Sequence, residues 1–177
     1  MFLLSSTNSL FIDKLINVFN QTSHLFTTDQ SKKYYQEIKF EIKNNRINIQ
    51  IQNKIESMLY APIRIPDIFN EITSLLKHLN ISAGSLIYNP IQQRVSYNNL
   101  SIELGIIHNL IFSSFILNQN EGIEKRLLYL KIWPEDKNIF INKLDTHLTN
   151  LKNKFKKELD YDLSFKSLNG LIYLNVN

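Results

Sequence analysis

Apolar and polar residues follow one another in the first half of the chain in a pattern that predicts a mixture of strands and helices. Residues 2–5 form a short apolar run, as in a strand, and apolar residues then recur at helical spacing after Ser9, which is placed to cap that helix. The pattern predicts a second strand at residues 24–27 and a second helix at residues 30–43. In residues 47–51, Ile alternates with Asn and Gln, as in a half-buried strand.

A further helix closes this half of the chain. An apolar run at residues 58–65 is interrupted by Pro62, and Pro66 and Asp67 then begin a helix that ends near Asn80. Its predicted inward face consists of Ile68, Phe69, Ile72, Leu75 and Leu76. Strands that alternate with helices in this way are typical of an α/β domain.

The second half has a different order of elements. Residues 82–85 are small and flexible, and they predict the boundary between a first domain at residues 1–81 and a second at residues 82–177. The pattern after this boundary predicts a hairpin around Asn89 and Pro90, helices at residues 101–118, 124–132 and 138–157, and a terminal hairpin around Asn169 and Gly170. Three helices followed by a hairpin are the elements of a winged helix-turn-helix, which is an α+β domain.

The last of these helices has two contrasting faces. A single apolar stripe is formed by Ile141, Leu144, Leu148, Leu151 and Phe155. The opposite face presents Asn142, Lys143, Thr146, Thr149, Asn150, Asn153 and Lys157, with His147 and Lys154 on one flank and Lys152 and Lys156 on the other. Lysine can pair with phosphate, Asn can contact adenine in bidentate fashion, and Thr can meet a thymine methyl, so this face suits a major groove. Ordinary solvation of a lysine-rich surface helix explains the same pattern equally well.

The order of motifs supports the first of these two interpretations. Residues 144–148, Leu-Asp-Thr-His-Leu, and residues 151–155, Leu-Lys-Asn-Lys-Phe, together resemble the recognition-helix signature of OmpR-type response regulators. Residues 126–133, Arg-Leu-Leu-Tyr-Leu-Lys-Ile-Trp, resemble the positioning helix of that family, which ends in a buried Trp. Residues 100–103 stand where the family begins its first helix, and residues 170–174 stand where its wing closes the fold.

This resemblance implies a transcriptional regulator that binds duplex DNA, with RNA polymerase as a further partner. It places His147 near the DNA backbone and leaves Lys166 and Asn169 as the wing candidates, while Trp133 is expected to be a core anchor. Asn150 and Lys152 stand where the family usually has arginines. Because lysine cannot grip guanine as arginine does, we expect a preference for A·T-rich sites.

The first domain resembles a shortened receiver. Residues 2–21 and 61–69 resemble the start and the end of such a domain, but its Lys-Pro pair is replaced by Ala-Pro, and at least one βα unit is missing. The acidic pair that holds magnesium in receivers is replaced by Ser5, Ser6 and Thr7. The resemblance therefore implies a reduced, degenerate receiver-like α/β domain without magnesium ligands.

No phosphoacceptor is predicted in this half. Asp29 and Asp67 are interpreted as a turn or cap residue and a helix-start residue. Regulation is then expected to be independent of phosphorylation. An incomplete sheet exposes an edge or an apolar face, which self-association would cover, so we expect a homodimer formed through the first domain.

Composition narrows the class of function. The chain has 177 residues, 44% of them hydrophobic, which is enough for a buried core, and it has no Cys for disulfides or thiolate metal sites, as expected of a soluble cytoplasmic protein. A net charge of +4 is compatible with nucleic acid without requiring it. Four scattered His, four Gly and the lack of a phosphate-binding loop argue against an enzyme and against a metal or other cofactor.

Two alternatives to the DNA-binding regulator remain. A winged helix can also serve as a protein-interaction module without specific DNA binding, because fold does not fix function. A regulator competent for phosphotransfer would need an acceptor that the sequence does not show.

Overall fold

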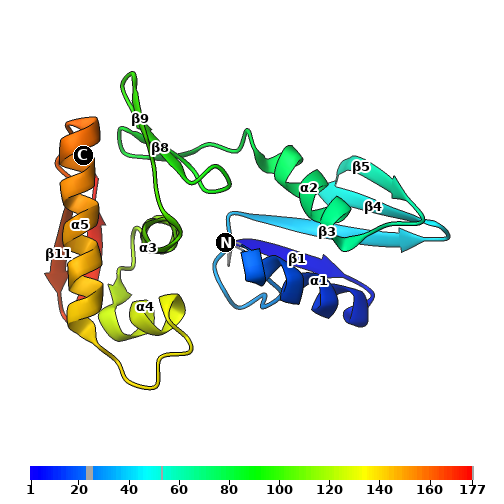
Figure 1. Ribbon diagram of the computed structural model, residues 1–177, viewed down its shortest axis with the longest axis horizontal. Coiled ribbons are helices and arrows are strands. Elements are labelled where there is room, and N and C mark those ends of the chain that lie inside the picture. The colour runs from blue at the N-terminus through cyan, green and yellow to red at the C-terminus, as the bar shows by residue number, and fades with distance from the viewer. Residues whose placement is uncertain (23–25, 53, 177) are drawn as a thin grey trace. The chain divides into compact units, whose positions relative to one another are not determined.

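A computed structural model describes residues 1–22, 26–52 and 54–176 of the chain, which divides into two compact units, Met1–His78 and Leu79–Asn177 (Figure 1). The second unit begins a few residues before the boundary predicted at 81 and 82. The reason is that Ile81–Ala83 is a strand, β6, whose residues pair with those of the next strand, so the small residues at 82–85 form a hairpin rather than a linker. None of the helices among the described residues has both the length and the apolar character needed to span a membrane.

Unit 1 combines one mixed sheet with two helices. Its elements are β1 (Phe2–Ser6), α1 (Ser9–Thr22), β2 (Phe26–Thr27), β3 (Gln36–Lys43), β4 (Arg46–Ile51), β5 (Lys54–Tyr60) and α2 (Ile65–Leu76). The strand order is β2-β1-β3-β4-β5. Strand β1 is parallel to both of its neighbours, whereas β3, β4 and β5 form an antiparallel meander. The α/β class predicted from the sequence is confirmed.

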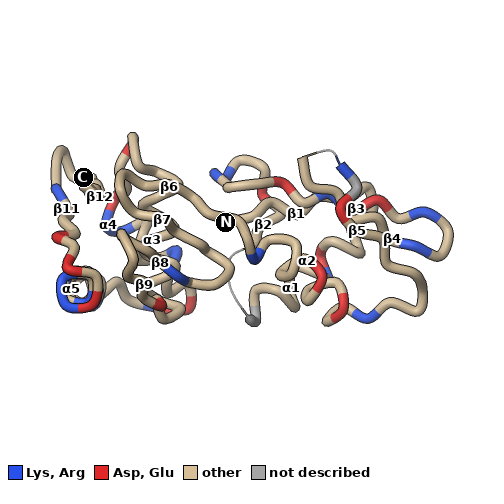
Figure 2. Tube along the Cα trace, turned by 90° about the horizontal axis from the view of Figure 1, so that it is seen from above, with Lys and Arg blue, Asp and Glu red and all other residues tan. Residues whose placement is uncertain are grey.

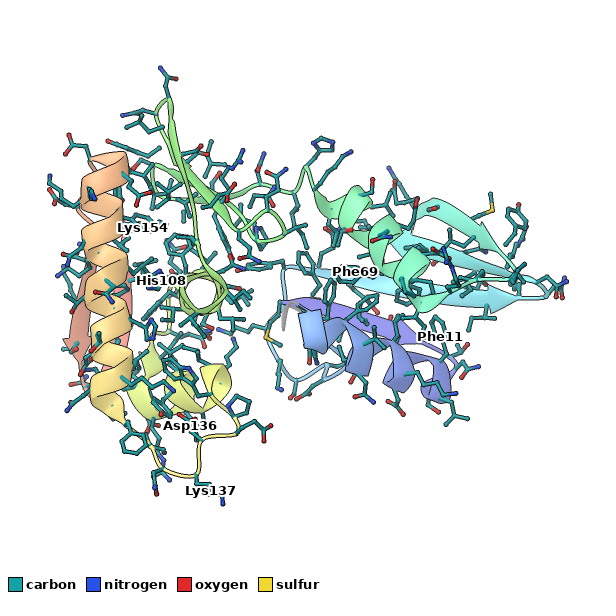
Figure 3. The ribbon with its side chains drawn as sticks, viewed as in Figure 1. Phe11, Phe69, His108, Asp136, Lys137 and Lys154 are labelled. Carbon is teal, nitrogen blue, oxygen red and sulfur yellow. The ribbon has the colours of Figure 1, made fainter. Side chains whose placement is uncertain are left out.

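Aromatic rings join both helices of unit 1 to the sheet. Phe19 of α1 packs edge-on against Phe26 of β2 and Phe69 of α2, with ring centroids 5.0 and 4.9 Å apart. Phe11 of α1 packs against Phe40 of β3 at 5.6 Å, and Figure 3 labels Phe11 and Phe69 on their helices. Rings in such edge-to-face arrangements add to the stabilisation gained by burying their area.

Most predicted elements of unit 1 are present, with differences at their ends. Asn8 rather than Ser9 caps α1, because its side-chain oxygen accepts the backbone N–H of Phe11 at 3.0 Å. Helix α2 ends at Leu76, before the predicted Asn80. Of the strand predicted at 24–27, Phe26 and Thr27 form β2, and residues 24 and 25 lie outside the described residues.

The helix predicted at residues 30–43 is wrong. Residues Gln36–Lys43 are strand β3, which pairs with β1 on one side and β4 on the other. Ile38 and Phe40, two positions apart, are buried and face the same side of the sheet. Glu37, before Ile38, and Lys39, between the two, are exposed. This alternation is the period of a strand.

Unit 2 has the architecture of a winged helix-turn-helix. Strands β6, β7 (Leu86–Asn89), β8 (Arg94–Tyr97) and β9 (Leu100–Glu103) form an antiparallel sheet, followed by α3 (Ile106–Leu117), β10 (Ile123–Glu124), α4 (Lys125–Ile132), α5 (Ile141–Leu159), β11 (Ser164–Leu168) and β12 (Leu171–Asn175). The last two strands form the terminal hairpin, to which β10 adds a third strand. Helices α4 and α5 with this hairpin, the wing, confirm the predicted fold of the second domain.

One predicted helix boundary in unit 2 is wrong. Residues 100–103 were expected to begin the first helix of the domain, but they form β9, which pairs with β8. Helix α3 begins at Ile106, and Gly105 in an extended conformation occupies its N-cap. Ile102 and Leu104 are buried while Ser101 and Glu103 are exposed, which is again the alternation of a strand.

Candidate nucleic-acid interface

Helix α5 buries one stripe and exposes the opposite face. Its buried residues are Leu144, Leu148, Leu151, Phe155 and Leu159, and Ile141, the first residue of the predicted stripe, is only half-buried. Phe155 contacts Phe112 of α3, whose ring also meets Tyr88 of β7, so the stripe continues into the core of unit 2. The exposed side consists of Asn142, Thr146, Thr149, Asn150, Asn153 and Lys157, which we call the outward face of α5.

Two hydroxyl groups on the outward face are turned back to the helix. Thr146 donates its hydroxyl hydrogen to the carbonyl of Asn142 at 2.8 Å, and Thr149 donates to the carbonyl of Asp145 at 2.9 Å. These hydrogens are therefore already used. The γ-methyl groups and the amides of the neighbouring Asn side chains remain as the groups with which this face can read a base edge.

Most lysines on α5 already have acidic partners. Lys156 pairs with Asp160 and Asp162 at 3.2 Å each, and these carboxylates raise the pKa of its ammonium group. Lys154 lies 3.9 Å from Glu158. Figure 2, which views α5 end-on, shows basic and acidic residues interleaved around the helix. The positive charge of this helix is therefore smaller than its lysine content indicates.

The single acid in the first half of α5 is also paired. Asp145 accepts a hydrogen bond from Lys125 of α4 at 2.6 Å, which joins the two helices of the helix-turn-helix. Within the described part of unit 2, no ion pair engages Lys152, Lys157 or Lys166. These three lysines are the cations most available to phosphate near α5 and the wing.

Lys143 is held at the first turn of α5 by a small polar cluster. Its ammonium group lies 2.9 Å from Asp136 and 4.3 Å from the ring centroid of Trp133. The hydroxyl of Tyr129 donates to the same carboxylate. These hydrogen bonds, first from Tyr129 and then from Lys143, lower the pKa of Asp136, while burial and the bond to Asp136 raise the pKa of Tyr129.

His147 faces the other helices rather than the outward face. Its ring lies 5.4 Å from the half-buried Trp133 and 5.6 Å from His108 of α3, measured between centroids. Its Nδ1 is buried without a hydrogen-bond partner among the described residues. Burial, and secondarily the charge of Lys143, lowers the pKa of His147. A contact of His147 with the DNA backbone stays a prediction that this orientation does not favour.

The wing places Lys166 opposite an aromatic ring. Lys166 on β11 is exposed and pairs in register with Tyr173 on β12, and Asn169 and Gly170, at φ of 52° and 80°, make the two-residue turn between them. Tyr173 lies directly over Gly122, because a Cβ there would come within 2.7 Å of its ring. A shallow hollow beside this ring is lined by Gln119, Lys166 and Asn175.

The sequence indicated the exposed face of α5 but not the residues of other elements that position the helix. The structure brings Lys125, Asp136 and His108 into contact with α5 or its side chains from other elements. Nothing in the spacing of these residues along the chain marks them, because each contact joins separate elements. The predicted candidates divide into the outward face, the paired Lys143 and Lys154, the inward-facing His147, and Lys166 on the wing.

No protein-family model matches this chain, and no curated protein matches it. Several solved structures resemble it, and three of them do so over 54% of its length. They are the DNA-binding domain of E. coli CadC (14% identity, 91% of that chain, TM-score 0.46), the C-terminal domain of the nisin resistance regulator NsrR, a lantibiotic response regulator (21%, 96%, 0.43), and the DNA-binding domain of CpxR from E. coli (20%, 95%, 0.45). At these identities the likeness concerns the fold alone.

Proposed function

We propose that this protein is a transcriptional regulator that binds duplex DNA with α5 in the major groove and acts without phosphorylation. The observation that supports this most directly is the outward face of α5. It is exposed over the whole helix and rich in Asn and Thr, while the opposite stripe is buried against the rest of unit 2. An α-helix held in this way fits the width of a major groove.

The composition of the outward face favours A·T base pairs. Asn142, Asn150 and Asn153 present amides that can pair with the N6 and N7 positions of adenine, and the methyl groups of Thr146 and Thr149 can pack on thymine. No arginine occurs in α5. Because a bidentate contact to guanine is the usual role of arginine, we expect G·C pairs to be read poorly at the centre of the site.

Phosphate contacts are expected to be few. Lys152, Lys157 and Lys166 are exposed, whereas Lys143 and Lys154 would first have to leave or share their acidic partners. About three phosphate contacts for each copy would give a salt slope of about −2.7. Binding of one copy to a single site is then weak at physiological salt, and two linked copies on adjacent half-sites would bind far better.

The remaining parts of the proposal concern unit 1 and its partners. The end of β1 carries Ser5 and Ser6, and the hydroxyl of Ser5 donates to Glu37 at 2.5 Å, an arrangement that does not resemble an acidic magnesium site. We therefore assign unit 1 a dimerising role rather than a phosphorylation switch. RNA polymerase is the expected protein partner, and the cytoplasm the expected compartment.

Selection from a random duplex pool by the full-length protein tests the proposal. The wild type should enrich an A·T-rich site, and the double variant Asn150→Ala/Asn153→Ala should lose at least about tenfold in affinity for it, since each good bidentate contact contributes about 1–3 kcal/mol of discrimination. Gln92→Ala, an exposed polar residue near the β7–β8 turn, is the matched control and should bind as the wild type does. Equal binding of every sequence by both proteins would contradict major-groove reading by α5.

A protein-interaction module is the second candidate. The ion pairs of Lys143, Lys125 and Lys156 neutralise much of the charge that would attract DNA. In addition, Leu127 of α4 and Phe140 before α5 are 60% and 58% exposed, as in a surface that contacts protein. If the folded wild type binds no duplex even at low salt, this second function replaces the first.

A further inference from the structure

Two histidines face each other between α3 and α5. The rings of His108 and His147 are 5.6 Å apart at an interplanar angle of 77°. Nε2 of His108 and Nδ1 of His147 are both buried, and neither has a hydrogen-bond partner among the described residues. Buried polar atoms in native structures are nearly always paired, so two such atoms in one contact require an explanation.

The lysines whose charges influence this pair lie on α5. The positive charge of Lys154 lowers the pKa of His108, and that of Lys143 lowers the pKa of His147. Figure 3 shows His108 and Lys154 in the region where α3 and α5 face each other. The ring of Trp133, the residue that follows α4, lies 5.4 Å from the ring of His147 and is tilted by 42° to it. A proton added to either imidazole would therefore meet neighbouring positive charge.

The acids near the pair are engaged elsewhere. Asp136 is hydrogen-bonded to Tyr129 and Lys143, Asp145 is hydrogen-bonded to Lys125, and Glu158 is exposed and paired with Lys154. Strand β9, which packs on α5, contributes Glu103, but this residue is exposed and paired with Arg94. Strand β12, which packs on α3, has no charged side chain. Among the described residues, no carboxylate accepts a hydrogen bond from either histidine.

We propose that His108 and His147 form a proton-sensitive contact that adds to the packing of α5 on α3 while both rings are neutral and is lost when either ring is protonated. An imidazolium at this position would be close to a second histidine and to Lys143 or Lys154, without a counter-ion. Both side chains are only half-buried, so relief comes from turning the charged ring toward solvent, which removes the ring contact and loosens α5 against α3. The outward face of α5 would then lose its fixed orientation.

The direction of the pH effect follows from burial. Burial, and then the neighbouring positive charges, lowers the pKa of both His108 and His147 below the ordinary histidine value of about 6.5. A histidine whose pKa is lower in the folded state than in the unfolded state favours folding at pH values above its unfolded-state pKa. This contribution to stability is lost as the pH falls through the folded-state pKa. The contact is therefore closed at neutral pH and opens in mild acid.

Trp133 provides a direct probe, because it is the single Trp of the chain and lies against His147. Protonated imidazole quenches indole emission more strongly than neutral imidazole does. Emission of the full-length protein without DNA should fall on acidification with a midpoint below that of an exposed histidine. The variant His147→Gln should abolish this step, and His78→Gln, at an exposed histidine on α2's C-terminal side, should leave it unchanged.

A midpoint at or above the ordinary histidine value, or an unchanged step in His147→Gln, would overturn the proposal. If His147→Gln does not fold, the imidazole proton resonances of the wild type give the same midpoints for each histidine and decide in the same way. Opening of the contact is measured by thermal melting. Between pH 7.5 and 5.5 the wild type should lose more stability than His108→Gln/His147→Gln, and equal losses count against the proposal.

The consequence for DNA rests on the proposed function. Wild-type affinity for the selected site should weaken several-fold across the same pH range, and the double His→Gln variant should bind with a flat pH profile. Absence of DNA binding at every pH, together with a normal Trp133 titration, would refute the proposed function and leave the proton-sensitive contact intact. A normal DNA affinity that is flat with pH in the wild type would refute the regulatory consequence.

Discussion

The first turn of α5 depends on one carboxylate that serves two partners. Asp136 accepts hydrogen bonds from Tyr129 and Lys143, and both lower its pKa below the ordinary value of 3.8. Since the folded-state pKa is depressed, Asp136 stabilises the fold above about pH 4 and this contribution disappears as the pH falls further. We expect Asp136→Asn to unfold at a lower urea concentration than the wild type at pH 7, with the difference shrinking toward pH 3.

The control for this prediction is Asp162→Asn, which removes an exposed carboxylate that shares Lys156 with Asp160. Because Lys156 keeps its other partner, the urea midpoint should hardly change. A constant gap between Asp136→Asn and the wild type from pH 7 to pH 3 would mean that the carboxylate acts through packing rather than through its charge.

Two glycines with positive φ should differ in how they tolerate a methyl group. Gly122 and Gly170 both have positive φ, but a Cβ on Gly122 would meet the ring of Tyr173 at 2.7 Å, whereas one on Gly170 meets nothing within 4 Å. Gly170→Ala should destabilise the protein by about 1 kcal/mol through backbone strain alone. Gly122→Ala should add about 1–3 kcal/mol for the displaced ring. Urea unfolding of both variants measures the difference, and equal effects would show that Tyr173 moves freely.

At the level of elements, one buried amide joins α3 to the β7–β8 hairpin. The carbonyl of Asn109 accepts the hydroxyl of Tyr88 at 2.8 Å, and its amide donates to the carbonyl of Pro90 at 3.3 Å. Asn109→Ala leaves both partners buried without Asn109, which should destabilise unit 2 by about 2–4 kcal/mol, because each lost buried bond costs about 1–3 kcal/mol. Tyr88→Phe removes one of the two bonds and should lose about half as much stability. Scanning calorimetry of both variants measures these losses. A larger loss of stability in Tyr88→Phe than in Asn109→Ala would mean that the hydrogen bonds of Asn109 are not the main link between α3 and this hairpin.

The elements predicted best from the sequence are those whose apolar period comes from one buried face. Helix α5 is such an element, since Leu144, Leu148 and Leu151 are all buried and α5 lies within two residues of the predicted end and three of the predicted start. Strand β3 was mistaken for a helix because its polar residues Gln36 and Lys43 extend a helix-forming composition around a core of alternating Ile and Phe. Pairing with β1 and β4 makes these residues a strand, and the local composition carries no information about that pairing.

The sequence predicted only the part of the candidate site that lies on a single helix. The outward face of α5 follows from periodicity, but the contacts of Lys143 with Asp136 and of His147 with His108 join different elements. A histidine or lysine looks equally available on a helical projection whether or not another element covers it. The sequence therefore did not show that Lys143, Lys154 and Lys156 have acidic partners.

For the whole molecule, the sheet of unit 1 bears on the resemblance to a receiver. The order β2-β1-β3-β4-β5 is that of doubly wound domains of the receiver type, in which the sheet is parallel and helices connect successive strands. Here β4 is antiparallel to both of its neighbours, so these three strands follow one another without crossover helices. This accounts for the short length of the unit, and its assignment as a receiver-like domain stays a prediction.

The same sheet suggests where two copies could meet. Strand β5 is a seven-residue edge, and its Met58 and Tyr60 are 46% and 65% exposed, whereas the opposite edge, β2, has two residues. A long exposed edge pairs readily with another strand, and a second copy would supply one in antiparallel orientation. Met58→Lys/Tyr60→Lys should therefore shift the protein from dimer to monomer in sedimentation equilibrium, because charged side chains on an edge oppose pairing.

The variant Leu10→Lys is the control, since Leu10 is 73% exposed on α1, away from that edge, and should leave the dimer intact. Loss of the dimer should also change DNA binding, because two linked copies contact about twice as many phosphates as one copy does. On paired half-sites, the salt slope of the wild type should be about twice that of the edge variant, while on a single half-site the two proteins should agree. A monomeric wild type, or equal slopes on paired half-sites, would remove unit 1 from DNA recognition and leave unit 2 to bind alone.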